Sequence, residues 1–150
     1  MPSDNHNAPQ RGLSYYGLSL LSFLKESHPD LAENSDFIES RASLAAKTYS
    51  EVIRSGRTHP EAGEEATAVL FDGLHFSLYD TLADVLREEF ADTIPEKEVR
   101  EAARVMFPFV RGLREKYDLT DDFASTPEYD LLYTEVTGAV RILLERHGLQ

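Results

Sequence analysis

The sequence contains no cysteine among its 150 residues. This absence excludes disulfides, thiol nucleophiles, and zinc or iron–sulfur sites with cysteine ligands. Basic residues are also few: 15 lysines and arginines stand against 27 aspartates and glutamates, which gives a net charge of −12. A field of this sign repels phosphate backbones and anionic lipids, so we expect no direct nucleic-acid or membrane binding. The surplus acid either solvates helix surfaces or faces a partner with a basic surface.

No long apolar run is present. The most apolar stretch, residues 18–24, is interrupted by Ser19 and Ser22 and is far shorter than the roughly 20 residues of a membrane span. The charged residues Lys25 and Glu26 follow it where a signal peptide would have its cleavage site. We therefore expect a buried helix here, and a cytoplasmic protein.

Familiar catalytic signatures are missing as well. The sequence has no G-x-S-x-G, P-loop, G-x-G-x-x-G or H-E-x-x-H motif, and no Glu-x-x-His pair of the kind that binds metals in helical bundles. The nearest arrangement is Asp72 with His75, predicted one helical turn apart, followed by Asp80 beyond a tight corner. A single Asp-x-x-His pair is common by chance, and we interpret His75 as a helix-end histidine. No catalytic residue, metal or cofactor is assigned.

Helical periodicity runs through most of the chain. Residues 1–11 contain almost nothing apolar and are expected to form a disordered tail, whereas residues 12–150 are expected to form a single helical domain. No run of alternating polar and apolar residues indicates a strand. The predicted fold is all-α, an irregular bundle of about six helices. These helices are expected over residues 13–27, from Asp36 to Gly56, from Thr58 to about 75, from Ser77 to about 90, from Pro95 to about 117, and from Thr126 to Gly148.

Capping signals mark several of these starts. Asp36 is followed by a glutamate three residues on, and Thr58 is followed by Pro60 and Glu61, an arrangement typical of a capping box. In the fifth segment, apolar spacing continues straight through Pro108, which lacks the N–H that a helix interior uses. Either one helix kinks at Pro108 or two short helices abut there.

Two of the predicted helices carry apolar residues on more than one face. Residues 13–27 are apolar nearly all the way round, so this helix is expected to lie in the core or to be shared with another subunit. The last helix has a main apolar stripe and, on a second side, Leu131 and Ile142. We expect it near the centre of the bundle.

Tyrosines and acidic residues gather in residues 120–133. Two of these tyrosines, at 129 and 133, are one helical turn apart, and tyrosine is common both in cores and at interfaces. Core packing with partnered hydroxyls is the first interpretation, and a binding face is the second. With the residues around the corner after the third helix, the candidate binding residues are His75, Tyr79, Asp80, Tyr129 and Tyr133.

Three stretches carry a resemblance to a known family: LSYYGLSLLSFLKESHPDL (13–31), GLHFSLYDTLADVLREEF (73–90) and DDFASTPEYDLLYTEVTG (121–138). Through them the chain resembles a Bacteroidetes family described only as a domain of unknown function (DUF1896-like), whose members occur on conjugative transposons. The resemblance spans nearly the whole chain after the tail. It implies an all-α fold and brings no catalytic or binding residues with it.

Three hypotheses for function follow. The first is a non-enzymatic intracellular interaction or accessory protein of a bacterial mobile element, whose partner is another protein or a second copy in a homo-oligomer. The second is an acidic nucleic-acid mimic that binds a basic protein groove, which requires carboxylates at phosphate-like spacing on one face. The third is an enzyme or metal protein with a site near residues 72–80, using Asp72, His75, Tyr79 or Asp80.

Overall fold

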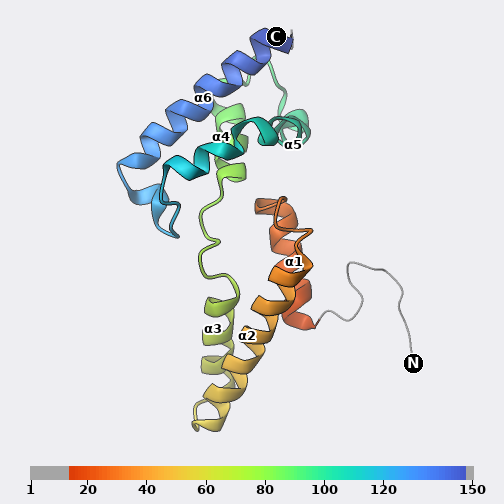
Figure 1. Ribbon diagram of the computed structural model, residues 1–150, viewed down its shortest axis with the longest axis vertical. Helices are drawn as coiled ribbons and strands as arrows, with labels where there is room; N and C mark the ends of the chain where they lie inside the picture. Colours follow the sequence, from red (N-terminus) through yellow and green to blue (C-terminus); the bar gives the residue numbers. More distant parts are fainter. Residues whose placement is uncertain (1–13, 148–150) are drawn as a thin grey trace, which may run out of the picture. The chain divides into compact units, whose positions relative to one another are not determined.

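The computed structural model describes residues 14–147, and in this part of the chain it contains helices and turns but no strand (Figure 1). The predicted all-α fold of about six helices is confirmed. The predicted tail over residues 1–11 and the helix stop at Gly148 lie outside the described residues. The α-helices are α1 (Tyr15–Ser27), α2 (Ser35–Arg54), α3 (His59–Leu70), α4 (Leu78–Glu89), α5 (Val99–Val110) and α6 (Glu128–His147), and the 3-10 helices are η2 (Glu96–Glu98), η3 (Arg111–Lys116) and η4 (Phe123–Ser125).

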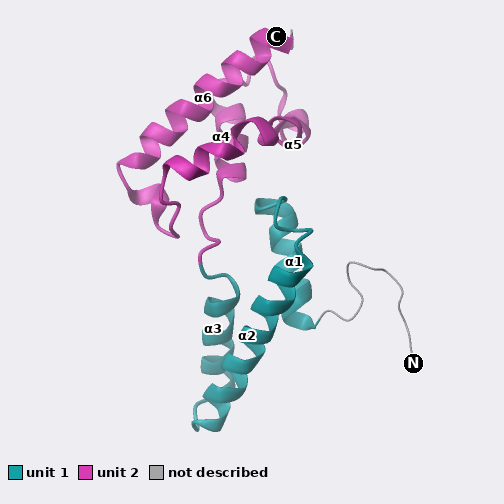
Figure 2. Cartoon of the chain, in the orientation of Figure 1, with its two compact units in different colours: residues 1–72 teal, residues 73–150 magenta. Residues whose placement is uncertain are grey.

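The helices fall into two compact units (Figure 2). Unit 1, residues 1–72, holds α1, α2 and α3, and unit 2, residues 73–150, holds α4, α5 and α6, where the sequence predicts one domain over residues 12–150. The units meet in the sequence at the turn after α3. There Gly73 has φ of +79°, a left-handed conformation that side chains other than glycine rarely adopt.

Helix starts in unit 1 follow local capping. The predicted capping box of α3 is confirmed: the Thr58 hydroxyl accepts from the Glu61 N–H at 3.2 Å, and the Glu61 carboxylate accepts from the Thr58 N–H at 3.0 Å. The predicted cap of α2 at Asp36 is wrong. Asn34 caps the helix instead, since its side-chain oxygen accepts from the Phe37 N–H at 3.0 Å. Asparagine caps as well as aspartate does, which leaves Asp36 in the first turn, where its charge favours the positive end of the helix dipole.

The end of α3 differs from the prediction, because the helix stops at Leu70 and not near residue 75. Arg41 of α2 occupies this end: its Nη1 donates to the carbonyls of Val69, Leu70 and Asp72 at 3.3, 3.1 and 2.8 Å. Its guanidinium also lies over the Phe37 ring, 4.9 Å from the centroid. A cation at the negative end of a helix dipole stabilises the helix terminus, and α3 has no basic residue of its own in its last turn.

Packing of α1 is one-sided. Leu20, Leu21 and Leu24 are buried, while Tyr15 and Leu18 are exposed to solvent. In unit 1 the helix packs on α2, which lies between α1 and α3 as their common neighbour. Of the two expectations for this helix, a central place in the core is wrong for unit 1, and its sharing with another subunit stays a prediction.

The central helix of unit 2 is α4. It packs against both α5 and α6, and seven of its 12 residues are buried. The start of α4 at Ser77 is as predicted, since the serine hydroxyl accepts from the Asp80 N–H at 3.0 Å. The predicted central place of α6 is wrong, because Leu131 and Ile142 on its second side are 60% and 54% exposed. The buried stripe of α6 consists of Leu132, Val136, Val140 and Leu144.

Pro108 lies in the last turn of α5, which continues to Val110 and passes directly into η3. The chain therefore forms an α-helix joined end to end to a 3-10 helix, but the junction follows Val110, so Pro108 lies inside α5 and does not separate the two helices. At the start of α6, the predicted cap Thr126 lies before the helix, and its hydroxyl donates to the Phe123 carbonyl at 2.7 Å. Among the described residues no helix has both the length and the apolar character needed to cross a membrane.

Candidate functional site

His75 lies on the connection between α3 and α4, with its side chain exposed. Its backbone N–H donates to the Asp121 carboxylate at 2.9 Å, and the Gly73 N–H donates to the same carboxylate at 3.0 Å. The imidazole Nε2 is 3.9 Å from this carboxylate. Asp121 thus links the start of unit 2 to the loop before η4 through hydrogen bonds, and His75 takes part in this link through its backbone N–H.

Tyr79 and Asp80 face different surroundings from His75. Tyr79 is buried, its hydroxyl donates to the Arg100 carbonyl at 3.4 Å, and its ring packs edge-on against Phe107 with centroids 5.6 Å apart. Asp80 is half-buried in the first turn of α4. No group of three potential metal ligands occurs among residues 14–147. The contacts described for residues 73–80 are those of core packing and of the start of a helix.

Tyr129 and Tyr133 lie together on α6, with ring centroids 6.2 Å apart. The Tyr133 hydroxyl lies within hydrogen-bond distance of two carboxylates of α4, Glu88 at 2.7 Å and Glu89 at 3.0 Å. Burial, followed by these hydrogen bonds, raises the pKa of Tyr133, so the phenol keeps its proton as a donor. Tyr129 packs against Phe76, with centroids 6.0 Å apart. Both tyrosines join α6 to its neighbours within unit 2, and a binding role for them stays a prediction.

Three carboxylates form a row along one face of α4, near these tyrosines. Asp80, Asp84 and Glu88 are spaced by four residues, which places them on one helix face at steps of about 6 Å. Arg87 pairs with Asp84 at 3.3 Å, and Tyr133 bonds Glu88. Two of the three carboxylates therefore already have partners within unit 2. This arrangement weakens the hypothesis that this face mimics a phosphate backbone.

The pKa of Asp84 is raised, first by burial and then by the charges of Glu88 and Asp80, against the opposing charge of Arg87. Because the folded-state pKa lies above the unfolded one, this carboxyl contributes most stability below the ordinary aspartate pKa of about 3.9, and the contribution is lost as pH rises through the folded value. As pH rises above this value, the thermal midpoint of unfolding of the unmodified protein should fall. We expect this fall to be smaller in Asp84→Asn.

The effect of Asp84→Asn should be small, because the side chain is 50% exposed and solvent screens its charge. A carbon-13 NMR titration of the Asp84 carboxyl measures the same shift directly. Titration at or below the ordinary aspartate range would contradict the burial of this carboxyl.

The second surface of interest is a groove with a cavity volume of about 410 Å³ beside α5. Its floor is apolar, since the buried side chains of Ile94, Met106 and Leu144 line it together with Ala102. Val105 forms part of its wall and is 50% exposed. Phe109, one turn further along α5, is 64% exposed, and its ring centroid is 6.4 Å from that of His147 on α6.

The rim of this groove carries two glutamates, Glu98 and Glu101. Arg104 pairs with Glu101 through two hydrogen bonds, at 3.1 and 2.5 Å, and they lower the pKa of Glu101. Glu98 forms no ion pair with any residue in the described part of the chain. We refer to the floor, wall and rim residues as the α5 groove. Phe109 does not line the groove and is exposed one helical turn after Val105.

Sequence reasoning missed the α5 groove. The buried stripe through Val99, Ala103 and Met106 was predicted, and all three are buried. Val105 and Phe109 stand off this stripe, four residues apart on the outer side of the same helix. Apolar residues at helical spacing outside the buried stripe were the available signal.

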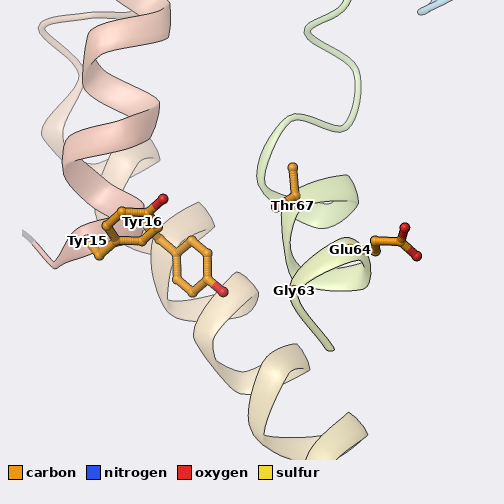
Figure 3. A pocket seen from close by; sticks show the side chains of 5 residues that line it. All are labelled: Tyr15, Tyr16, Gly63, Glu64 and Thr67. Carbon is orange, nitrogen blue, oxygen red and sulfur yellow. The ribbon is translucent and has the colours of Figure 1, made fainter. Parts of the chain in front are cut away.

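A second hollow lies in unit 1, with a cavity volume of about 430 Å³ (Figure 3). Tyr15 and Tyr16 of α1 line one side, and Gly63, Glu64 and Thr67 of α3 line the other. The Glu64 carboxylate points away from the tyrosines (Figure 3). A Cβ placed on Gly63 would meet no atom within 4 Å. Because its polar groups do not converge, this hollow is a weaker candidate than the α5 groove.

Comparison with known proteins gives a family. The chain is similar to protein PG0816 from Porphyromonas gingivalis, known from a crystal structure: 38% of aligned residues are identical, the TM-score is 0.83, and the alignment covers 97% of this chain and 99% of that one. No curated protein matches the sequence. A family model matches residues 8–149. The resemblance noted in the sequence is thus confirmed, and the chain belongs to the family described as "Domain of unknown function (DUF1896)".

Proposed function

We propose that this protein is a non-enzymatic interaction module that binds a protein partner through the α5 groove. The observation that carries the proposal is an exposed Val105 in the wall of an apolar groove, with a second exposed apolar side chain, Phe109, one helical turn further along α5. Grouped apolar side chains at a groove are typical of protein-binding sites. The proposal includes a cytoplasmic accessory role, and the resemblance noted in the sequence adds the setting of a bacterial mobile element.

The other two hypotheses have less support. A nucleic-acid mimic needs free carboxylates in a row, whereas Asp84 and Glu88 are held by Arg87 and Tyr133. An enzyme near residues 72–80 would need converging side chains, whereas Tyr79 is buried in the core of unit 2. The α5 groove is the surface where shape and chemistry together favour a partner.

Site-specific cross-linking tests the proposal. A photo-reactive amino acid placed at Val105 in the full chain, expressed in cells that carry its gene, should give a discrete protein adduct. The adduct should disappear when Phe109→Ser is added, because the partner then loses an apolar contact one helical turn beyond Val105. Adduct mass and mass spectrometry of the cross-linked peptide give the readout.

Two positions on α6 provide the matched control. Leu131 and Ile142 are exposed apolar residues of the same unit, and both lie outside the α5 groove. A photo-reactive residue at either position should give no such adduct. Equal adducts at all positions, or none at Val105, would reject the groove as the binding site. An adduct of two identical chains would identify a homo-oligomer instead of a different partner.

A further inference from the structure

We infer that the occupant of the α5 groove is a basic amphipathic helix of a partner protein. This inference rests on the proposed function and adds the chemistry of the partner. The groove offers three features to an occupant: an apolar floor, an exposed apolar ridge, and a negative rim.

The shape of the surface favours a helix. Ridges of apolar side chains four residues apart pack into the grooves of a second helix, and Val105 and Phe109 form such a ridge on α5. From Val99 to Phe109 α5 rises about 15 Å, which corresponds to about three turns of a partner helix. Apolar residues at positions i, i+3, i+4 and i+7 would meet the floor at Met106 and Leu144.

The charge of the surface favours a basic occupant. Glu98 and Glu101 stand on the rim, and the whole chain carries a net charge of −12. A second copy of this acidic chain would bring further negative charge to the rim, whereas lysines or arginines beside an apolar helix face complement it.

The two glutamates should contribute unequally. Glu101 is already neutralised by Arg104, whereas Glu98 has no ion-pair partner among the described residues. A cation of the partner is therefore stabilised more by the charge of Glu98 than by that of Glu101. We expect Glu98→Gln to weaken binding more than Glu101→Gln does.

Defined peptides test this inference on the full-length protein. The probe is a fluorescent peptide of about 18 residues, roughly five helical turns, with leucines at helical spacing and lysines on the other face. A second peptide has glutamate in place of lysine, and a third has a central proline that breaks the helix. Fluorescence anisotropy should show binding of the first peptide, with affinity at least about tenfold above that of either other peptide.

Matched double variants locate the binding. Val105→Ser with Phe109→Ser should weaken binding of the lysine peptide by at least about tenfold, since both apolar contacts are lost. Leu131→Ser with Ile142→Ser removes two equally exposed apolar side chains from α6 and should leave the affinity unchanged. Glu98→Gln, on an exposed residue, keeps the test decisive if the first double variant unfolds.

Several outcomes would overturn the inference: equal binding of the glutamate peptide, equal binding of the proline peptide, no binding of any peptide, or insensitivity to the groove substitutions. The last would indicate unspecific attraction to an acidic protein. A specific adduct at Val105 together with such a failure would leave the interaction module standing and reject only the basic helix. Loss of both results would reject the proposed function itself.

Discussion

Leu82→Ala is expected to lower the free energy of unfolding of unit 2 by about 3 kcal/mol, within the range of about 2–5 kcal/mol for buried leucines. Leu82 has no exposed surface and lies on α4, the helix that both α5 and α6 pack against. Alanine removes the apolar contacts and leaves a cavity that the rigid neighbours fill only in part. Few single substitutions in this chain should cost more.

Urea unfolding followed by circular dichroism measures the loss, with separate fits if the two units unfold in separate transitions. Leu131→Ala is the matched control, because this leucine lies in the same unit but is largely exposed. We expect the control to change the free energy of unfolding by less than about 0.5 kcal/mol. Similar losses for both substitutions would contradict the central position of α4.

Arg41→Met is expected to destabilise unit 1 by about 2 kcal/mol. Methionine keeps most of the apolar stem but removes the charged hydrogen bonds to the carbonyls of Val69, Leu70 and Asp72 at the end of α3. Hydrogen bonds with a charged partner are worth about 1.5–3 kcal/mol, and solvent recovers part of the loss where the carbonyls are exposed. The stacking on Phe37 is lost as well.

The damage of Arg41→Met should be local. Hydrogen exchange by mass spectrometry is expected to show faster exchange in the last turn of α3 than in α2. Lys47→Met, which removes the same charge from an exposed position of α2, is the control and should leave exchange in α3 unchanged. Protection of α3 that is equal in both variants would refute the role of Arg41 as its cap.

Features set by nearby residues were predictable from the sequence. The starts of α3 at Thr58 and α4 at Ser77 depend on hydrogen bonds over three residues, which a local pattern shows. The start of α2 was misplaced because Asn34 and Asp36 both suit a cap and stand two residues apart. Local preference alone does not choose between two such signals.

Features set by distant residues were not predictable in this way. The end of α3 depends on Arg41, which stands 28 to 31 residues earlier in the chain than the carbonyls it binds. The same limit applies to the central helix of unit 2. Both α4 and α6 have apolar stripes, and each packs against the other two α-helices of unit 2. Only the packing shows that seven of the 12 residues of α4 are buried while Leu131 and Ile142 of α6 remain exposed.

The candidate site was the least predictable feature. The five candidate binding residues were chosen for their chemistry, yet Tyr79 lies in the core and Tyr133 bonds Glu88 and Glu89 within unit 2. Val105 and Phe109 carry no polar group, so no sequence motif marks them as binding residues. Their interest comes from exposure, which depends on how three separate helices pack.

The division into two units has a consequence for synthesis of the chain. Each unit is continuous in the sequence, because unit 1 ends at residue 72 and unit 2 begins at residue 73. All partners of α1, α2 and α3 within unit 1 therefore leave the ribosome before any of unit 2 does. Since helical units with local contacts fold in microseconds to milliseconds and ribosomes add about 5–20 residues per second, unit 1 has time to fold while unit 2 is still being made.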